Sequence, residues 1–125
     1  MTERELRDRT KAFALGILKL VDAIPDSRAG RIVASQIGRC ATSVEANYRA
    51  ACRSRLPAEM ISKFAIVEEE ADETVYWLEI ATERGLVPAE MCKLLSAEAS
   101  ELTAIMVASR RTLQRRTGRE QPTSP

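Results

Sequence analysis

The chain has 125 residues, of which 45% are hydrophobic and 30% charged, and its formal net charge is +1. It contains no histidine, so imidazole acid–base catalysis is excluded, and three scattered cysteines without histidine do not make a zinc site. The charged N-terminus and the lack of an apolar run of about 18 residues predict a cytoplasmic protein without a signal peptide or a membrane span. Cys40, Cys52 and Cys92 are therefore expected to be reduced thiols.

Three prolines, Pro25, Pro57 and Pro88, divide the chain into four stretches with helical apolar spacing. Proline lacks an N–H donor and clashes with the preceding turn, so it occurs at helix starts and in loops. The pattern predicts an all-α fold, an antiparallel up-down-up-down four-helix bundle. Residues 1–117 are expected to form this single domain, and residues 118–125 a flexible C-terminal tail.

The first predicted helix covers residues 3–23, and the second follows a turn and covers residues 27–52. Gly16 lies in the middle of the first helix, where glycine is unfavourable, and this indicates the close approach of a neighbouring helix. Apolar residues at three- and four-residue spacing mark the buried face of each helix. In the first they are Leu6, Thr10, Phe13, Ile17, Leu20 and Ile24, and in the second Val33, Ile37, Cys40, Val44, Tyr48 and Ala51.

The third predicted helix begins at Pro57 and stops before Gly85, and the fourth begins at Pro88 and ends at Gly118. The buried face of the third helix is expected to contain Met60, Phe64, Val67, Ala71, Val75, Leu78 and Thr82. That of the fourth is expected to contain Cys92, Leu95, Ala99, Leu102, Met106, Ser109 and Leu113.

Charge is divided unevenly along the chain. Residues 25–56 contain six basic and two acidic side chains, whereas residues 57–84 contain two basic and eight acidic ones. At 100° per residue, five arginines of the second helix fall within an arc of about 80°. They are Arg28, Arg31, Arg39, Arg49 and Arg53. Three interpretations remain open: a solvated basic face, ion pairs with the acidic third helix of the same or another chain, and a nucleic-acid surface.

A polar stripe formed by Gln36, Ser43 and Asn47 lies between these arginines and the apolar face. If buried, such side chains need partners, and a buried polar layer can fix the register of helices or subunits.

The third helix contains the acidic run EEEADE, and its helical wheel places Glu68 and Asp72 on an outer face. A second, partly apolar face contains Ile66, Glu70, Glu73, Trp77 and Ile80. A helix with two apolar faces usually packs on two sides, so this face is a candidate oligomer interface. Without histidine, the carboxylates do not match a di-metal bundle, and we expect no metal and no cofactor.

A second basic group lies near the end of the fourth helix. It consists of Arg110, Arg111, Arg115, Arg116 and Arg119. Cations are favoured at the C-terminal end of a helix dipole, and phosphate contact is the alternative interpretation.

Four segments together resemble a known family. They are DRTKAFALGILKLV, SQIGRCATSVEANYRAACRSR, EMISKFAIVEEEADETVYWLEIATERGLV and ELTAIMVASRRT. This order of motifs is similar to the bacterial four helix bundle protein family, also called the intervening-sequence or S23 family. The positions that match its recurring pattern are Asp8, Arg9, Gln36, Arg39, Ser43, Asn47, Lys63, Glu73, Trp77 and Leu78.

The resemblance implies an antiparallel four-helix bundle that assembles into a homo-pentamer. It also implies a link to intervening sequences of large-subunit ribosomal RNA genes, which encode some relatives. A distant relative, the accessory protein of diversity-generating retroelements, is a basic pentamer that binds nucleic acid and a reverse transcriptase. No catalytic residue can be transferred from the family. The net charge of +1 distinguishes this chain from such strongly basic relatives.

The sequence as a whole predicts a non-enzymatic, homo-oligomeric bundle that binds nucleic acid, with RNA as the expected class, through the five arginines of the second helix. The alternative is a structural or protein-interaction ring whose arginines pair with carboxylates of the third helix. We expect no membrane partner and no small-molecule substrate.

Overall fold

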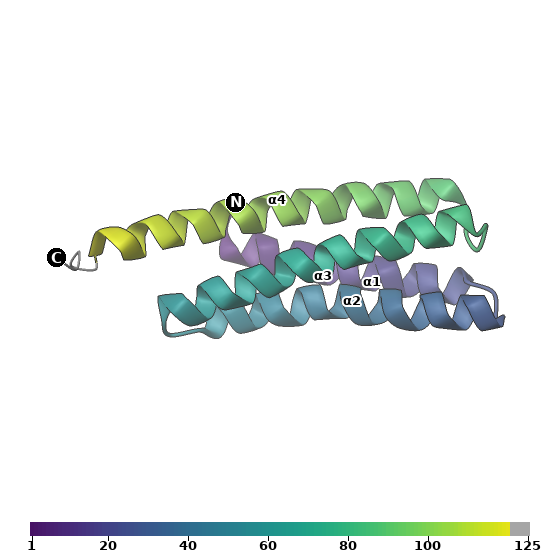
Figure 1. Cartoon of the computed structure of the whole chain (residues 1–125), viewed down its shortest axis with the longest axis horizontal. Helices are drawn as coiled ribbons and strands as arrows, with labels where there is room; N and C mark the ends of the chain where they lie inside the picture. Colours follow the sequence, from purple (N-terminus) through teal and green to yellow (C-terminus); the bar gives the residue numbers. More distant parts are fainter. Residues whose placement is uncertain (121–125) are drawn as a thin grey trace.

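The computed structural model describes residues 1–120, and side chains for residues 1–118. Four antiparallel helices follow one another along the chain (Figure 1). They are α1 (Glu3–Ala23), α2 (Arg28–Arg53), α3 (Pro57–Glu83) and α4 (Ala89–Glu120). The predicted all-α four-helix bundle is therefore confirmed. Within the described part of the chain, no helix combines the length and the apolar character that crossing a membrane requires.

Local side-chain chemistry explains where the first helices begin. Thr2 and Glu5 form a capping box, in which the Thr2 hydroxyl accepts from the Glu5 N–H and the Glu5 carboxylate accepts from the Thr2 N–H. Ser27 caps α2 by accepting from the Gly30 N–H at 2.9 Å. Pro57 occupies the start of α3, as predicted, but the preceding Leu56 offers no capping side chain.

The expected end of the last helix at Gly118 is wrong, because α4 continues to Glu120. An isolated glycine costs a helix only about 1 kcal/mol relative to alanine, which neighbouring residues can offset. Gly85, by contrast, adopts a φ of 69° just after α3, where a residue with a Cβ atom is disfavoured. Of the predicted tail, residues 121–125 lie outside the described residues.

The core lies along the facing stripes of the four helices, as the apolar spacing predicts. Its large, fully buried side chains include Ile17, Leu20, Ile37, Val44, Val67, Leu78, Leu102 and Met106. Two buried threonines, Thr10 and Thr74, are satisfied locally, because each hydroxyl donates to a backbone carbonyl in the preceding turn. Seven of the predicted core positions are only partly buried: Ile24, Met60, Val75, Thr82, Leu95, Ser109 and Leu113.

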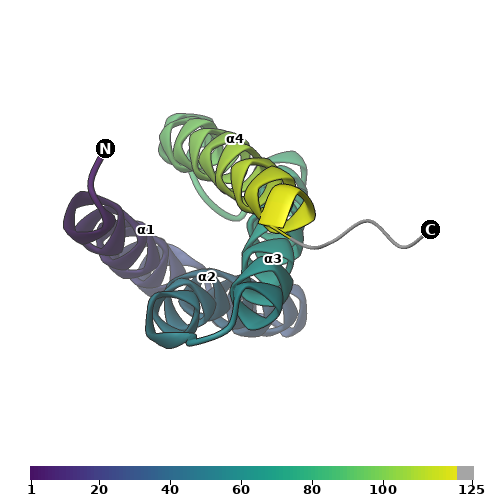
Figure 2. The ribbon, with the colours of Figure 1, turned by 90° about the vertical axis from the view of Figure 1, so that its left-hand side faces the viewer.

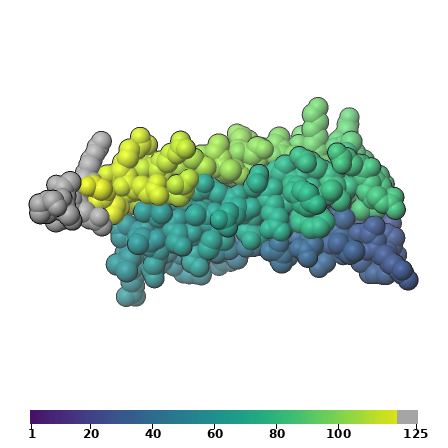
Figure 3. Space-filling model, viewed as in Figure 1, coloured from purple at the N-terminus to yellow at the C-terminus, as the bar shows by residue number. Residues whose placement is uncertain are grey.

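Viewed end-on, the helices follow the order α1, α2, α3, α4 around the bundle (Figure 2). The α1–α4 pair has the fewest contacts of the four neighbouring pairs. A Cβ atom added to Gly16 of α1 would lie 3.2 Å from Leu95 Cδ2 of α4, which confirms the predicted close approach at this glycine. In the space-filling view, side chains of α4, α3 and part of α2 form the visible face of the bundle (Figure 3).

Candidate functional site

The five arginines predicted as a basic face lie on the outer side of α2. All five are exposed, because the buried stripe of the same helix, which includes Ile37 and Val44, points the opposite way into the core. The face spans roughly 38 Å from Arg28 to Arg53 at 1.5 Å per residue. In the single chain this face is exposed, and the arginines differ in what they contact.

Arg39 is engaged by α3. Its guanidinium donates to Glu73 at 2.7 Å and to Glu70 at 3.3 Å, and it also contacts the Cys40 sulfur at 3.1 Å. Its hydrogen bond to the Glu73 carboxylate raises the pKa of Arg39. Although burial acts in the opposite direction, the Arg39 guanidinium lowers the pKa of Glu73. Arg39 therefore joins α2 to α3 within one chain.

The other four arginines are less constrained. Arg31 pairs with Asp26 at 2.9 Å, and both side chains are largely exposed. Arg49 lies 3.7 Å from Glu45, one helical turn away. Within residues 1–118, Arg28 and Arg53 form no ion pair. Exposed pairs contribute about 0–1 kcal/mol, so an incoming anion can compete for these guanidinium groups.

The polar stripe beside the arginines is half-buried and satisfied inside α2. The Asn47 amide donates to the Ser43 carbonyl and hydroxyl, both at 2.9 Å, and Gln36 accepts a longer bond of 3.4 Å from Arg39. In the part of the chain with described side chains, none of the three bonds to another helix. Their role as a register layer between helices or subunits stays a prediction. The bonds described here all lie within α2 and do not support it.

The candidate interface on α3 lies along its seam with α2. Ile66, Glu70, Glu73, Trp77 and Ile80 are all half-buried, and Trp77 and Ile80 pack against the core of their own chain. The Trp77 ring meets Tyr76 edge-on at 5.0 Å, and Tyr76 itself is 52% exposed. The Trp77 Nε1 atom is buried and has no hydrogen-bond acceptor among the described residues. Participation of this face in an oligomer remains a prediction.

One group of potential metal ligands comes together in the described part of the chain. Atoms of Cys40, Glu70 and Glu73 lie within 4.8 Å of one another. The Arg39 guanidinium bonds to all three and supplies the positive charge that a cation would bring. Burial raises the pKa of the Cys40 thiol to about 12, which disfavours the thiolate that metal binding requires.

Three interhelical ion pairs, formed by two arginines, were not predicted from the sequence. Arg110 of α4 donates to Glu68 of α3 at 2.6 and 3.1 Å, so Glu68 does not lie on a free outer face, as its helical wheel had suggested. Arg9 of α1 pairs with Glu98 and Glu101 of α4 and reinforces the weakly packed α1–α4 pair. Glu68 and Glu98, respectively, raise the pKa values of Arg110 and Arg9.

The remaining arginines near the end of α4 have different environments. Arg111, Arg115 and Arg116 are exposed, whereas Arg110 is partly buried in its ion pair. The side chain of Arg119 lies outside the described ones. The group predicted from the sequence therefore contains one structural residue and three exposed cations.

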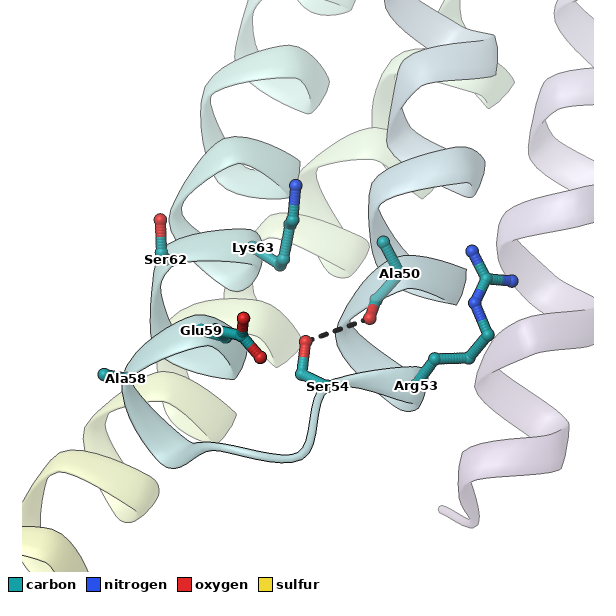
Figure 4. A pocket seen from close by; sticks show the side chains of 7 residues that line it. All are labelled: Ala50, Arg53, Ser54, Ala58, Glu59, Ser62 and Lys63. Carbon is teal, nitrogen blue, oxygen red and sulfur yellow. Dashed lines mark hydrogen bonds between the residues drawn. The ribbon is translucent and has the colours of Figure 1, made fainter.

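The turn between α2 and α3 borders a pocket of about 480 Å³ that is open to solvent (Figure 4). It is lined by Ala50, Arg53, Ser54, Ala58, Glu59, Ser62 and Lys63. The Ser54 hydroxyl donates to the Ala50 carbonyl at 3.0 Å and fixes one wall. Arg53, a predicted functional residue, contributes to the lining, but its guanidinium points away from Lys63 on the other side of α2 (Figure 4).

The architecture places this chain among antiparallel four-helix bundle proteins. Residues 3–108 match the family described as 23S rRNA-intervening sequence protein, and the chain belongs to this family. A crystal structure from Bacteroides thetaiotaomicron has a TM-score of 0.82 and 26% sequence identity, and the match covers 89% of this chain and 99% of that one. It is described as a protein with unknown function from the S23 ribosomal protein family. No curated protein matches the chain.

Proposed function

We propose that this protein is a non-enzymatic, cytoplasmic, homo-oligomeric bundle that binds RNA through the outer face of α2. The observation that carries the proposal is the state of Arg28, Arg31, Arg49 and Arg53. All four are exposed on one side of one helix, and none is held by a carboxylate of α3. Guanidinium groups in this arrangement can bind successive phosphates of a polyanion.

RNA is the proposed class of partner for two reasons. A helix that displays cations along roughly 38 Å suits an extended phosphate backbone better than a small anion. The family description refers to intervening sequences of 23S rRNA, and we extend that association to this chain as part of the proposal.

Self-association is the second part of the proposal, and the family resemblance suggests a pentamer. The proposed contact is the α3 face of Ile66, Glu70, Glu73, Trp77 and Ile80. Two exposed apolar side chains near this face support the proposal. Tyr76 is 52% and Ile32 is 60% exposed, and a second copy of the chain would cover them. The Arg39 pairing places Ile32 close to Ile80 along the antiparallel α2–α3 seam.

The alternative function is a structural ring whose arginines pair with carboxylates. Arg39 favours it, because this guanidinium contacts both Glu70 and Glu73. The other four arginines favour RNA binding. RNA binding therefore assigns phosphate contacts to Arg28, Arg31, Arg49 and Arg53, whereas a structural ring assigns protein contacts to all five arginines.

Matched glutamine variants separate the two functions. At about 50 mM salt, each phosphate contact contributes roughly tenfold to affinity, so the double variant Arg28→Gln/Arg53→Gln should bind RNA about 100-fold more weakly. Arg39→Gln removes the same kind of group from an ion-paired position, and it should reduce thermal stability while changing RNA affinity far less. Fluorescence anisotropy with labelled RNA measures both variants. Equal affinities for the wild type and the double variant would contradict RNA binding through this face.

A further inference from the structure

The last helix extends well past the start of the first, at the end of the bundle where α2 meets α3 (Figure 1). The capping box of Thr2 and Glu5 begins α1 level with Ser109 of α4, because Thr2 and Ser109 line the same recess. From Ser109, α4 continues to Glu120, roughly 16 Å further along its axis. The inner side of this stretch of α4 therefore lacks the cover that α1 provides elsewhere in the bundle.

An apolar groove lies in the uncovered region. Its larger recess, of about 400 Å³, is lined by Met60 and Phe64 of α3 and by Leu113 and Arg116 of α4, among others. A second recess, of about 250 Å³, shares Met60, Phe64 and Ser109 with the first and continues to the start of α1. We call the two connected recesses the end groove. The missing cover explains why Met60 and Leu113, both predicted core positions, are only half-buried.

The walls of the end groove are two rows of helical side chains. On α3, Phe64 follows Met60 by four residues, and on α4 the row of Ser109, Leu113 and Arg116 has spacings of four and three. Residues at these spacings share one face of a helix. A third helix packs its apolar side chains into the groove between two such rows. We propose that the end groove binds an acidic amphipathic helix of another protein, which occupies the place beyond the start of α1.

The charge around the end groove favours an acidic partner. Arg116 lines the larger recess, and Arg111 and Arg115 are exposed on the same stretch of α4. Among residues with described side chains, these three arginines form no ion pair. Glu3 is the one carboxylate among the lining residues, and it belongs to the smaller recess. Carboxylates on the polar side of a docked helix would therefore meet unpaired guanidinium groups at the edge of the groove.

The same features disfavour two other occupants. A second copy of this chain that approached with its own α4 would bring the exposed arginines of both copies together, and like charges repel. A phosphate backbone would meet the arginines, but it would not bury Met60, Phe64 and Leu113. The combination of an apolar lining with a basic edge therefore favours a helix with leucine-like side chains on one face and carboxylates on the other.

A pair of synthetic peptides tests the proposal. Each has about 14 residues, roughly four helical turns, with leucines spaced by three and four residues. The remaining positions are mostly glutamate in the first peptide and lysine in the second. Fluorescence anisotropy of the labelled peptides at about 100 mM salt measures binding to the full chain. The acidic peptide should bind with micromolar affinity, and the basic peptide at least about tenfold more weakly.

Variants of α4 locate the bound peptide. Leu113→Glu should weaken binding of the acidic peptide about tenfold or more, because it removes a buried apolar contact and adds a like charge. Leu94→Glu is the matched control, since Leu94 is 76% exposed near the other end of α4, and it should bind as the wild type does. Arg116→Gln should weaken binding about two- to fivefold. Arg111→Gln, on a side of α4 about 140° away, should have a smaller effect, and circular dichroism checks that each variant is folded.

Each alternative occupant gives a different result. The proposal is overturned if the acidic peptide does not bind, or if it binds Leu113→Glu as tightly as the wild type. A lower mass for Leu113→Glu than for the wild type, by light scattering without peptide, would show that a second copy covers the groove and would also overturn it. Weaker RNA binding by Arg116→Gln, without peptide binding, would assign these arginines to nucleic acid instead. RNA binding by α2 is not required for any of these peptide results.

Discussion

Replacing Phe64 by alanine tests how the bundle packs near the α2–α3 turn. Phe64 is only 9% exposed, and its ring stacks on Tyr48 with centroids 6.3 Å apart and an interplanar angle of 21°. Removing a buried phenylalanine typically costs about 3–5 kcal/mol. Phe64 also borders two recesses, of about 400 and 250 Å³, so neighbours such as Met60 can move into the vacated space. We therefore expect a loss near the lower limit, about 3 kcal/mol.

Thermal unfolding followed by circular dichroism measures this loss. At roughly 4 °C per kcal/mol for a chain of this length, Phe64→Ala should lower the midpoint by about 12 °C at a fixed protein concentration. Leu15→Ala is the control, because Leu15 is 57% exposed and its truncation should cost no more than about 0.5 kcal/mol. A shift of about 2 °C or less for Phe64→Ala, or equal shifts for both variants, would refute the assignment of Phe64 to the core.

Three further predictions concern the α3 face, the α2–α3 ion pair and the turn after α3. Trp77→Ala should lower the molecular mass in solution while helicity is retained, and an unchanged mass by light scattering would contradict the proposed interface. Arg39 holds the pKa of Glu73 below its ordinary value of 4.5, so the stability from this pair is full above about pH 4.5 and is lost as pH falls further. The difference in thermal midpoint between the wild type and Glu73→Gln should therefore shrink between pH 7 and pH 3; a constant or growing difference would disprove the linkage. Gly85→Ala should cost about 1–2 kcal/mol, because Gly85 has a φ of 69°, and a neutral effect in chemical denaturation would argue against this turn geometry.

Local signals in the sequence were sufficient to predict the helices. Pro57 marks the start of α3 because its missing N–H costs nothing in the first turn, and Gly85 marks the turn that follows. Gly118 misled the prediction, because the propensity of one residue cannot show whether the helix on either side of it continues. Helical periodicity alone sets the α2 arginines opposite the buried stripe of the same helix. Their exposure in the single chain therefore follows from their spacing in the sequence.

Partnerships between helices were less accessible to prediction. The helical wheel of α3 identifies Glu68 as outward-facing, but the rotation of α4 brings Arg110 against it. Pairing of the α2 arginines with carboxylates of the third helix was one of the interpretations left open by the sequence, but the register of α2 against α3 decides that Arg39 is the arginine that pairs with Glu70 and Glu73. The pocket at the α2–α3 turn is a further example, because only the folded turn brings Lys63 of α3 beside the last turn of α2.

The most direct test of RNA binding by α2 is an anisotropy titration of the wild-type protein with labelled structured RNA, single-stranded RNA and duplex DNA. If four exposed arginines contact phosphates, RNA should bind at micromolar concentration or tighter at about 50 mM salt. That affinity should fall by roughly 50-fold or more at about 200 mM salt. Absence of RNA binding at the lower salt would contradict the proposal and would favour a structural ring whose arginines serve contacts between proteins.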